Sequence, residues 1–187
     1  MSNFLRKYRL LALVGGVIIV VDQISKAWIR ANLSLGEAWA PIEALDPFFR
    51  IVHWYNTGVA FGLFQSMNEV FSVLALIVMV LIAYYFPRVP SQDWMLRLAL
   101  SLQFGGAGGN AIDRLTIGHV TDFVAVGDFP VFNVADSSIT IGVIVLLIGV
   151  WWQERHDRRE AQRARKIDSS METQVDSDRN GEPLRCE

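Results

Sequence analysis

The stretch Phe132-Asn133-Val134-Ala135-Asp136-Ser137-Ser138-Ile139-Thr140-Ile141-Gly142, FNVADSSITIG, leads directly into the apolar run VIVLLIGVWW of residues 143–152. Apolar segments of roughly 17 to 25 residues are long enough, as helices, to cross the hydrocarbon core of a bilayer. We expect such a helix from about residue 138 to 152. An ionisable group at the edge of a bilayer is costly unless it has a partner or a task. The rest of the sequence has to explain why Asp136 stands at the mouth of this helix.

The composition is that of a membrane protein. Of 187 residues, 52% are hydrophobic and only 19% are charged, which is unusual for a soluble domain. The net charge of -2 gives no basic excess, so we expect no nucleic-acid partner. The single cysteine lies in the polar tail and the three histidines are widely spaced, so we expect no disulfide, metal or cofactor; these residues are Cys186, His53, His119 and His156.

Three further segments have the composition of membrane spans, over about 10–29, 70–86 and 95–112. The third contains Gly105 and Gly109, a spacing that lets helices approach closely. We therefore predict a mainly α-helical membrane protein with four transmembrane helices.

Residues 1–152 are expected to form the membrane domain, followed by a charged tail over 153–187. Mixed charges predict that this tail continues as a solvated helix to about Lys166 and is disordered beyond it.

Basic residues indicate the orientation of the spans. They precede the first span, flank the loop between the second and third, and follow the fourth: Arg6, Lys7, Arg9, Arg88, Arg97, Arg155, Arg158, Arg159, Arg163, Arg165 and Lys166. All of these clusters fall on one side of the predicted membrane, which is the cytoplasmic side by the positive-inside rule. We expect both termini to be cytoplasmic and the loops over about 30–69 and 113–137 to face outward.

The first outer loop differs in kind from the spans. A turn-prone Asp46-Pro47 precedes a β-rich run over 48–55, and a second break follows at Asn56-Thr57-Gly58. We expect a small β-sheet over about 33–66 that lies on the outer membrane surface as a cradle.

Several charged residues within or near the spans require partners. Asp22 and Lys26 lie four apart on one helix face and are expected to pair. Arg114 follows the third span, and Asn110 shares its face if that helix continues. Asp113 is expected to be a structural partner for Arg114.

The outer acids Asp122, Asp128 and Asp136 admit two interpretations. A loop aspartate is most often a turn or cap residue, and Asp136 is placed to be the N-cap of the fourth helix. Alternatively, two adjacent carboxylates can share one proton, so that one member activates water while the other polarises a carbonyl. Such a pair hydrolyses peptides without a metal, serine or cysteine. The residues alone leave both interpretations open.

Two non-enzymatic functions also remain open at this point. A small ion- or proton-coupled transporter would use Asp22, Lys26 and Arg114 as pathway charges, although the chain has no evident internal repeat. A membrane scaffold packed through Gly105 and Gly109 would tolerate Asp-to-Asn changes at the outer acids.

Five segments, in order, resemble the lipoprotein signal peptidases (signal peptidase II) of bacterial cytoplasmic membranes: VDQISK (21–26), NTGVAFG (56–62), GGAGGNAIDR (105–114), GHVTDF (118–123) and FNVADSSITIG (132–142). The resemblance implies a monomeric aspartic endopeptidase, surrounded by membrane lipids, near the outer face of the inner membrane. Its substrates would be prolipoproteins, cleaved before a cysteine that carries a diacylglyceryl group. The catalytic aspartates of the family match Asp122 and Asp136.

The same motif match assigns site-supporting roles to Asp22, Lys26, Asn56, Gly58, Gly106, Asn110, Arg114 and Asn133. The loop between the two matched aspartates is shorter than in many members of the family, and it contains Asp128, for which the resemblance implies no role.

Overall fold

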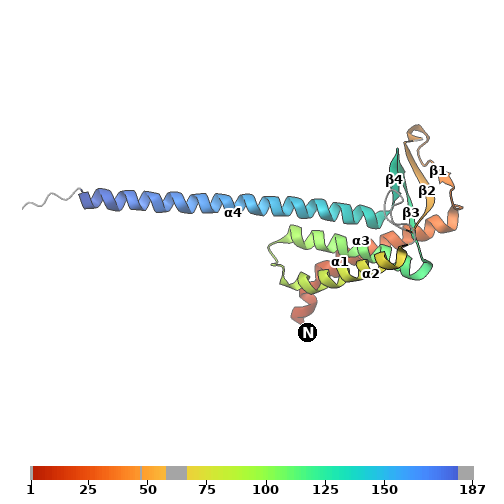
Figure 1. Ribbon diagram of the computed structural model, residues 1–187, viewed down its shortest axis with the longest axis horizontal. Helices are drawn as coiled ribbons and strands as arrows, with labels where there is room; N and C mark the ends of the chain where they lie inside the picture. Colours follow the sequence, from red (N-terminus) through yellow and green to blue (C-terminus); the bar gives the residue numbers. More distant parts are fainter. Residues whose placement is uncertain (1, 47, 58–66, 181–187) are drawn as a thin grey trace, which may run out of the picture. The chain divides into compact units, whose positions relative to one another are not determined.

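The computed structural model of the protein describes residues 2–46, 48–57 and 67–180. Its long helices are α1 (Ser2–Asn32), α2 (Asn68–Tyr85), α3 (Trp94–Ile117) and α4 (Val134–Asn180). Among the described residues, two short 3-10 helices, η1 (Glu43–Leu45) and η3 (Phe86–Arg88), lie between them. The chain divides into two compact units, Met1–Leu146 and Leu147–Glu187. In the first unit α3 packs against both α1 and α2 (Figure 1).

The predicted spans form helices, and the protein is an integral membrane protein. Among the described residues, the segments Arg6–Asn32, Asn68–Arg88 and Val134–Arg159 are long and apolar enough to cross a bilayer. Helix α3, with 24 residues, is also long enough, but it is rich in glycine and polar side chains. A fourth span at α3 therefore stays a prediction.

Charged and polar side chains are buried among the helices, while many large apolar side chains are exposed on their outer faces. Lys26 and Asp22 are fully buried, whereas Ile24 on the same helix is 65% exposed and Val80 on α2 is 67% exposed. This distribution is unfavourable in water and is the one expected when lipid surrounds the helices.

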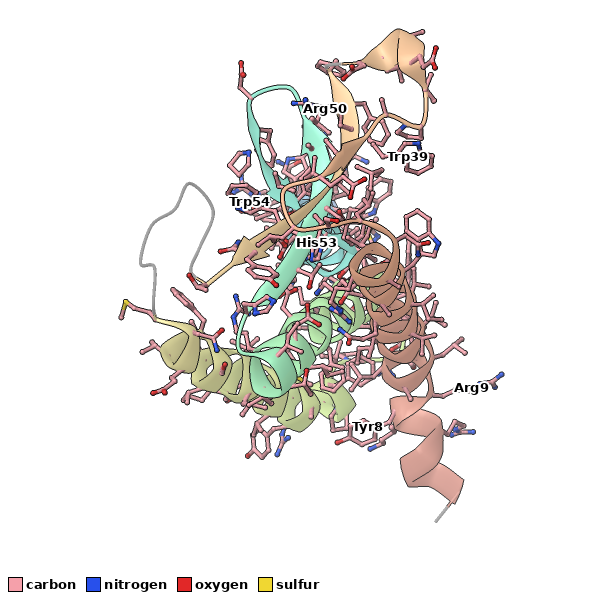
Figure 2. All side chains as sticks on the ribbon, turned by 90° about the vertical axis from the view of Figure 1, so that its right-hand side faces the viewer. Tyr8, Arg9, Trp39, Arg50, His53 and Trp54 are labelled. Atoms are coloured by element: carbon pink, nitrogen blue, oxygen red, sulfur yellow. The ribbon has the colours of Figure 1, made fainter. Side chains whose placement is uncertain are left out.

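A four-stranded antiparallel sheet stands at one end of the helices, in the order β1-β2-β3-β4 (Figure 1). Its strands are β1 (Ala38–Trp39), β2 (Phe49–Asn56), β3 (Val120–Val126) and β4 (Phe129–Phe132). In Figure 2, Trp39, His53 and Trp54 lie in this sheet region, whereas Tyr8 and Arg9 lie at the opposite end of α1. The sheet therefore occupies the end of the helices away from the basic N-terminus.

The β-rich run predicted over 48–55 is β2, but the predicted range of about 33–66 omits two strands of the sheet. Half of its strands come from the second outer loop, over 120–132. There β3 and β4 form a hairpin whose connection, Gly127-Asp128, lies between the paired residues Val126 and Phe129. Gly127 has φ +51°, a conformation that favours glycine in such turns. Pro47 and residues 58–66, which the prediction included, lie outside the described residues.

Glycines allow α3 to approach its neighbours closely, as predicted for Gly105 and Gly109. A Cβ on Gly105 would lie 2.7 Å from Cβ of Ile18, and one on Gly109 would lie 2.5 Å from the Asp22 carboxylate. A Cβ on Gly106 would lie 2.4 Å from the carbonyl oxygen of Ala135 at the start of α4. These distances are below normal carbon contacts, so only glycine fits at each position.

Helix α4 begins four residues earlier than predicted, at Val134, and it continues to Asn180. The prediction of disorder beyond about Lys166 was wrong for residues 167–180, which are helical. No glycine or proline interrupts that stretch before Gly181, so the backbone can continue the helix. Within the second unit the guanidinium of Arg155 lies 4.2 Å from the Trp151 ring centroid, a cation–π contact.

Candidate active site

The start of α4 is fixed by Asn133 and Asp136. Because α4 begins at Val134, the N-cap is Asn133 and not Asp136, which corrects the sequence-based expectation. Asn133 Oδ1 accepts the backbone N–H of Asp136 at 2.9 Å, and Asp136 Oδ2 accepts the backbone N–H of Asn133 at 3.3 Å. This reciprocal pair is a capping box with a shorter acid in place of glutamate. Asp136 therefore serves the helix terminus as its third residue.

Asp122 reaches the same place from β3. Its carboxylate accepts hydrogen bonds from two amides: Asn133 Nδ2 donates to Oδ1 at 2.6 Å, and Asn56 Nδ2, at the end of β2, donates to Oδ2 at 2.9 Å. Asn133 thus contacts both acids, with its side-chain nitrogen on Asp122 and its side-chain oxygen on the N–H of Asp136. The structure brings together the two aspartates that the motif match singled out.

The amide of Asn110 connects this pair to a buried lysine. Lys26 Nζ donates to Asn110 Oδ1 at 2.9 Å, and Asn110 Nδ2 donates to Asp136 Oδ1 at 2.7 Å. A lysine ammonium can only donate, so Asn110 must present its oxygen to Lys26 and its nitrogen to Asp136. The orientation of this amide is consequently fixed by chemistry as well as by packing.

Lys26 is held by two carboxylates and is fully buried. Its Nζ lies 2.8 Å from Asp22 Oδ2, the predicted pair, and 3.2 Å from Asp113 Oδ2. Asp22 also accepts the backbone N–H of Ala135 at 2.9 Å, so it binds the first turn of α4 to α1. Each buried charge therefore has an opposite charge or a hydrogen-bond donor beside it, as its burial requires.

The partner predicted for Asp113 was wrong. Its carboxylate pairs with Lys26 and, at 3.5 Å, with Arg30 of α1, because its position on α3 turns it toward α1. Burial lowers the pKa of Arg114, and the charges of Asp136, Asp122 and, least strongly, its neighbour Asp113 act in the opposite direction. Among the described residues its buried Nε has no hydrogen-bond partner. Arg114 thus interacts electrostatically with Asp136 and Asp122 as well as with Asp113.

Burial dominates the electrostatics of Asp122. Desolvation, and secondly the neighbouring charge of Asp136, raise the pKa of Asp122 from 3.8 to about 7. Hydrogen bonds from Asn56 and Asn133 and the charge of Lys26 act in the opposite direction but do not restore the ordinary value. Near neutral pH this carboxyl is therefore divided between its protonated and ionised forms.

Among the described residues, two other positions named in the sequence analysis, Gly106 and Asp128, are not part of this hydrogen-bonded cluster. Gly106 is buried where α3 meets α4, and Gly58 lies outside the described residues. Asp128 is exposed at the turn between β3 and β4.

Sequence reasoning missed three residues that hold the cluster: Gln23, Arg30 and Thr121. Gln23 Nε2 donates to Asp113 Oδ1 at 3.2 Å and to the carbonyl oxygen of Gly109 at 3.0 Å. The spacing of Gln23, Lys26 and Arg30 along one helix, three to four residues apart, was the available signal.

Comparisons with known proteins agree with this architecture. The family described as signal peptidase (SPase) II matches residues 14–152. The lipoprotein signal peptidase of Moorella thermoacetica is 39% identical over 134 residues, which are 72% of this chain and 87% of that protein. The lipoprotein signal peptidase of Staphylococcus aureus is 33% identical over 142 residues, 74% of this chain and 85% of that protein.

Two solved structures, both described as bacterial membrane enzymes, have the same fold. One has a TM-score of 0.71 at 32% identity over 77% of this chain and 88% of its own. The other has a TM-score of 0.67 at 33% identity over 75% of this chain and 91% of its own. The class defined by the fold is thus a membrane-embedded enzyme. The chain belongs to the signal peptidase II family and is a protease.

Proposed function

We propose that this protease removes signal peptides from prolipoproteins by an aspartic mechanism in which Asp122 and Asp136 are the catalytic pair. The observation that carries the proposal is the shared support of the two acids: Asn133 contacts both, and Asn110 contacts Asp136. The lipoprotein signal peptidases to which the chain is similar support the choice of substrate.

The two carboxyls have different surroundings, which supports different roles. Asp136 lies in the first turn of α4, where the helix dipole and the donors Asn110 Nδ2 and Asn133 N favour a negative charge. Asp122 lies on a strand, is almost fully buried, and has a pKa raised to about 7. We therefore assign the ionised form to Asp136 and the protonated form to Asp122.

In the proposed reaction Asp136 accepts a proton from water as the water oxygen attacks the scissile carbonyl carbon. The proton on Asp122 hydrogen-bonds to the carbonyl oxygen and passes to it as the water oxygen bonds to the carbon, which gives a neutral tetrahedral gem-diol intermediate. When the C–N bond breaks, the proton gained by Asp136 passes to the leaving amine, and Asp122 recovers its own proton as the carboxylic acid product forms. The pair returns with one shared proton, so no metal or covalent intermediate is required.

The position of the pair also supports a substrate held at the membrane surface. The sheet that carries Asp122 lies at the end of α1 opposite to Arg9, and the positive-inside rule assigns that basic end to the cytoplasm (Figure 2). We propose that the pair faces the outer side of the bacterial inner membrane and that both termini are cytoplasmic. Cleavage would occur before a cysteine whose diacylglyceryl group remains in the bilayer.

Arg114 and Asn56 are suited to bind the peptide around the scissile bond. Arg114 is half-buried near both acids, and a guanidinium fork can donate to backbone carbonyls of an extended peptide. Asn56 reaches Asp122 from the end of β2 and can position that carboxyl against the substrate.

The test is cleavage of a diacylglyceryl-modified prolipoprotein by the purified full chain in lipid. We expect Asp122→Asn and Asp136→Asn to lose turnover while remaining folded, and Asp128→Asn, the matched control at the exposed turn, to keep it. The unlipidated precursor should not be cleaved. An inactive wild type, or cleavage by both of the first two variants, would overturn the proposal and favour a transporter or scaffold.

A further inference from the structure

Thr121, the residue before Asp122, makes hydrogen bonds with its side-chain hydroxyl, its backbone N–H and its backbone carbonyl oxygen. Its hydroxyl oxygen accepts from Arg30 Nη1 at 3.0 Å, and its backbone N–H donates to Asp113 Oδ2 at 3.0 Å. Its carbonyl oxygen lies 3.5 Å from Asn133 Nδ2, and the residue is fully buried. Because neighbouring side chains of a strand point to opposite faces, Thr121 is held on one side of β3 while Asp122 is presented on the other.

Arg30 links this contact to the buried charges. Its Nη1 lies 3.5 Å from Asp113 Oδ1, so the same nitrogen bridges Asp113 and Thr121. The four ionic groups Asp22, Lys26, Asp113 and Arg30 balance as two negative and two positive charges. Without Arg30, Asp113 would retain one cation for its two oxygens, and the Thr121 hydroxyl would lose its charged donor.

We propose that Arg30 is a positioning residue of the proposed peptidase: through Thr121 and Asp113 it fixes the segment of β3 that presents Asp122 to the scissile bond. The assignment rests on the proposed function, but it adds a residue that the motifs do not contain. Arg30 acts through other residues, and it contacts neither Asp122 nor Asp136 among the described contacts.

This arrangement predicts a loss of kcat with little change in KM. The substrate would still bind, since Arg114 and Asn56 are unaltered, but the carboxyl of Asp122 would occupy its reactive position less often. Misplacement of a reacting group by about 1 Å can reduce the rate on the order of 100-fold. We expect Arg30→Gln and Thr121→Val each to lower kcat on the order of 10- to 100-fold.

Conservative variants separate the hydroxyl contact from general packing. Thr121→Ser keeps the acceptor for Arg30 and should retain kcat close to that of the wild type. Arg30→Lys keeps a cation beside Asp113 but cannot present the planar fork, so its kcat should lie between those of the wild type and Arg30→Gln. Arg158→Gln is the matched control, because Arg158 is exposed and pairs with Glu154 on its own helix, and its kcat should be that of the wild type.

A double-mutant cycle on the full chain in lipid decides the assignment, with kcat per folded molecule and KM measured for the lipidated prolipoprotein. Thr121→Val should lower kcat in the wild type but have little further effect in the Arg30→Gln background. The assignment would be overturned if the double variant lost kcat by the product of the two single-variant losses. A rise of KM alone in the single variants, or a wild-type kcat in Arg30→Gln, would also overturn it. Each of these results would leave the proposed function intact. Failure of the wild type to cleave would overturn both.

Discussion

Asn133 has two separable roles in one side chain, and two substitutions distinguish them. Its Oδ1 caps α4 through the N–H of Asp136, and its Nδ2 donates to Asp122 Oδ1 at 2.6 Å. Serine is about as good an N-cap as asparagine, but it has no amide to extend toward Asp122. Asn133→Ser should therefore keep the cap but lose the bonds that Nδ2 donates to Asp122, to Asn110 Oδ1 and to the carbonyl oxygen of Thr121, whereas Asn133→Ala should lose these bonds and the cap.

The magnitude of the difference follows from the cap. Replacing a good N-cap by alanine costs about 1 kcal/mol, within a range of roughly 0.5 to 2 kcal/mol. For a chain of this size 1 kcal/mol corresponds to a change in Tm of roughly 2–4 °C. We expect Asn133→Ala to unfold at a temperature lower by that amount than Asn133→Ser, as followed by thermal unfolding of each variant in the same detergent.

The two variants should nevertheless share one change in pH dependence. The hydrogen bond from Asn133 favours the ionised form of Asp122, so its loss raises the pKa of Asp122 further above its value of about 7. Protonated Asp122 then persists to higher pH. The alkaline limb of the pH profile of kcat should therefore shift to higher pH by the same amount in both variants. This account of Asn133 would be refuted if the alkaline limb of the kcat profile of Asn133→Ser lay at the same pH as in the wild type. Equal Tm values for the two variants would also refute it.

Three other outcomes follow from the contacts. Gly106→Ala should destabilise the protein by about 1–3 kcal/mol in chemical unfolding, since its Cβ would lie 2.4 Å from the Ala135 carbonyl oxygen; Gly16→Ala, where nothing lies within 4 Å, should not. Lys26→Met should cost about 3–5 kcal/mol because it leaves two buried carboxylates without their shared cation, and a loss below about 1 kcal/mol would contradict the ion-pair assignment. Folded Asp122 holds its proton to about pH 7 but unfolded Asp122 only to its ordinary 3.8, so the free energy of unfolding should fall as pH rises between these values. Asp122→Asn should remove this component, and an unchanged slope in that variant would argue against it.

The helices were predictable because their signals are local. Apolar length identified all four, and the four-residue spacing of Asp22 and Lys26 was sufficient to predict their ion pair. Close approach at Gly105 and Gly109 also followed from spacing, because residues four apart lie on one helix face.

The sheet was only half predictable because strand pairing joins distant segments. The run over 48–55 has an obvious β composition, but its partner β3 lies some 70 residues later, with Trp54 opposite Asp122. The turn-prone pair Gly127-Asp128 was the available hairpin signal, but it does not indicate which strand pairs with the run over 48–55. Likewise, nothing in the sequence near Asp113 indicates that it turns toward Lys26 and Arg30 instead of Arg114. That choice depends on how α3 is rotated against α1.

The two interpretations of Asp136, helix terminus and reactive acid, are compatible. The capping box requires a carboxylate at the third position of α4 and an amide at its N-cap, and the same amide holds Asp122. Asp22 adds a hydrogen bond to the N–H of Ala135, so the charges around Lys26 also support this first turn. Formation of the helix start thus assembles the acid pair. The turn loses its reciprocal bonds if either Asn133 or Asp136 is replaced by an apolar residue. A carboxylate stands at the mouth of this helix because the bonds that begin the helix also orient the site.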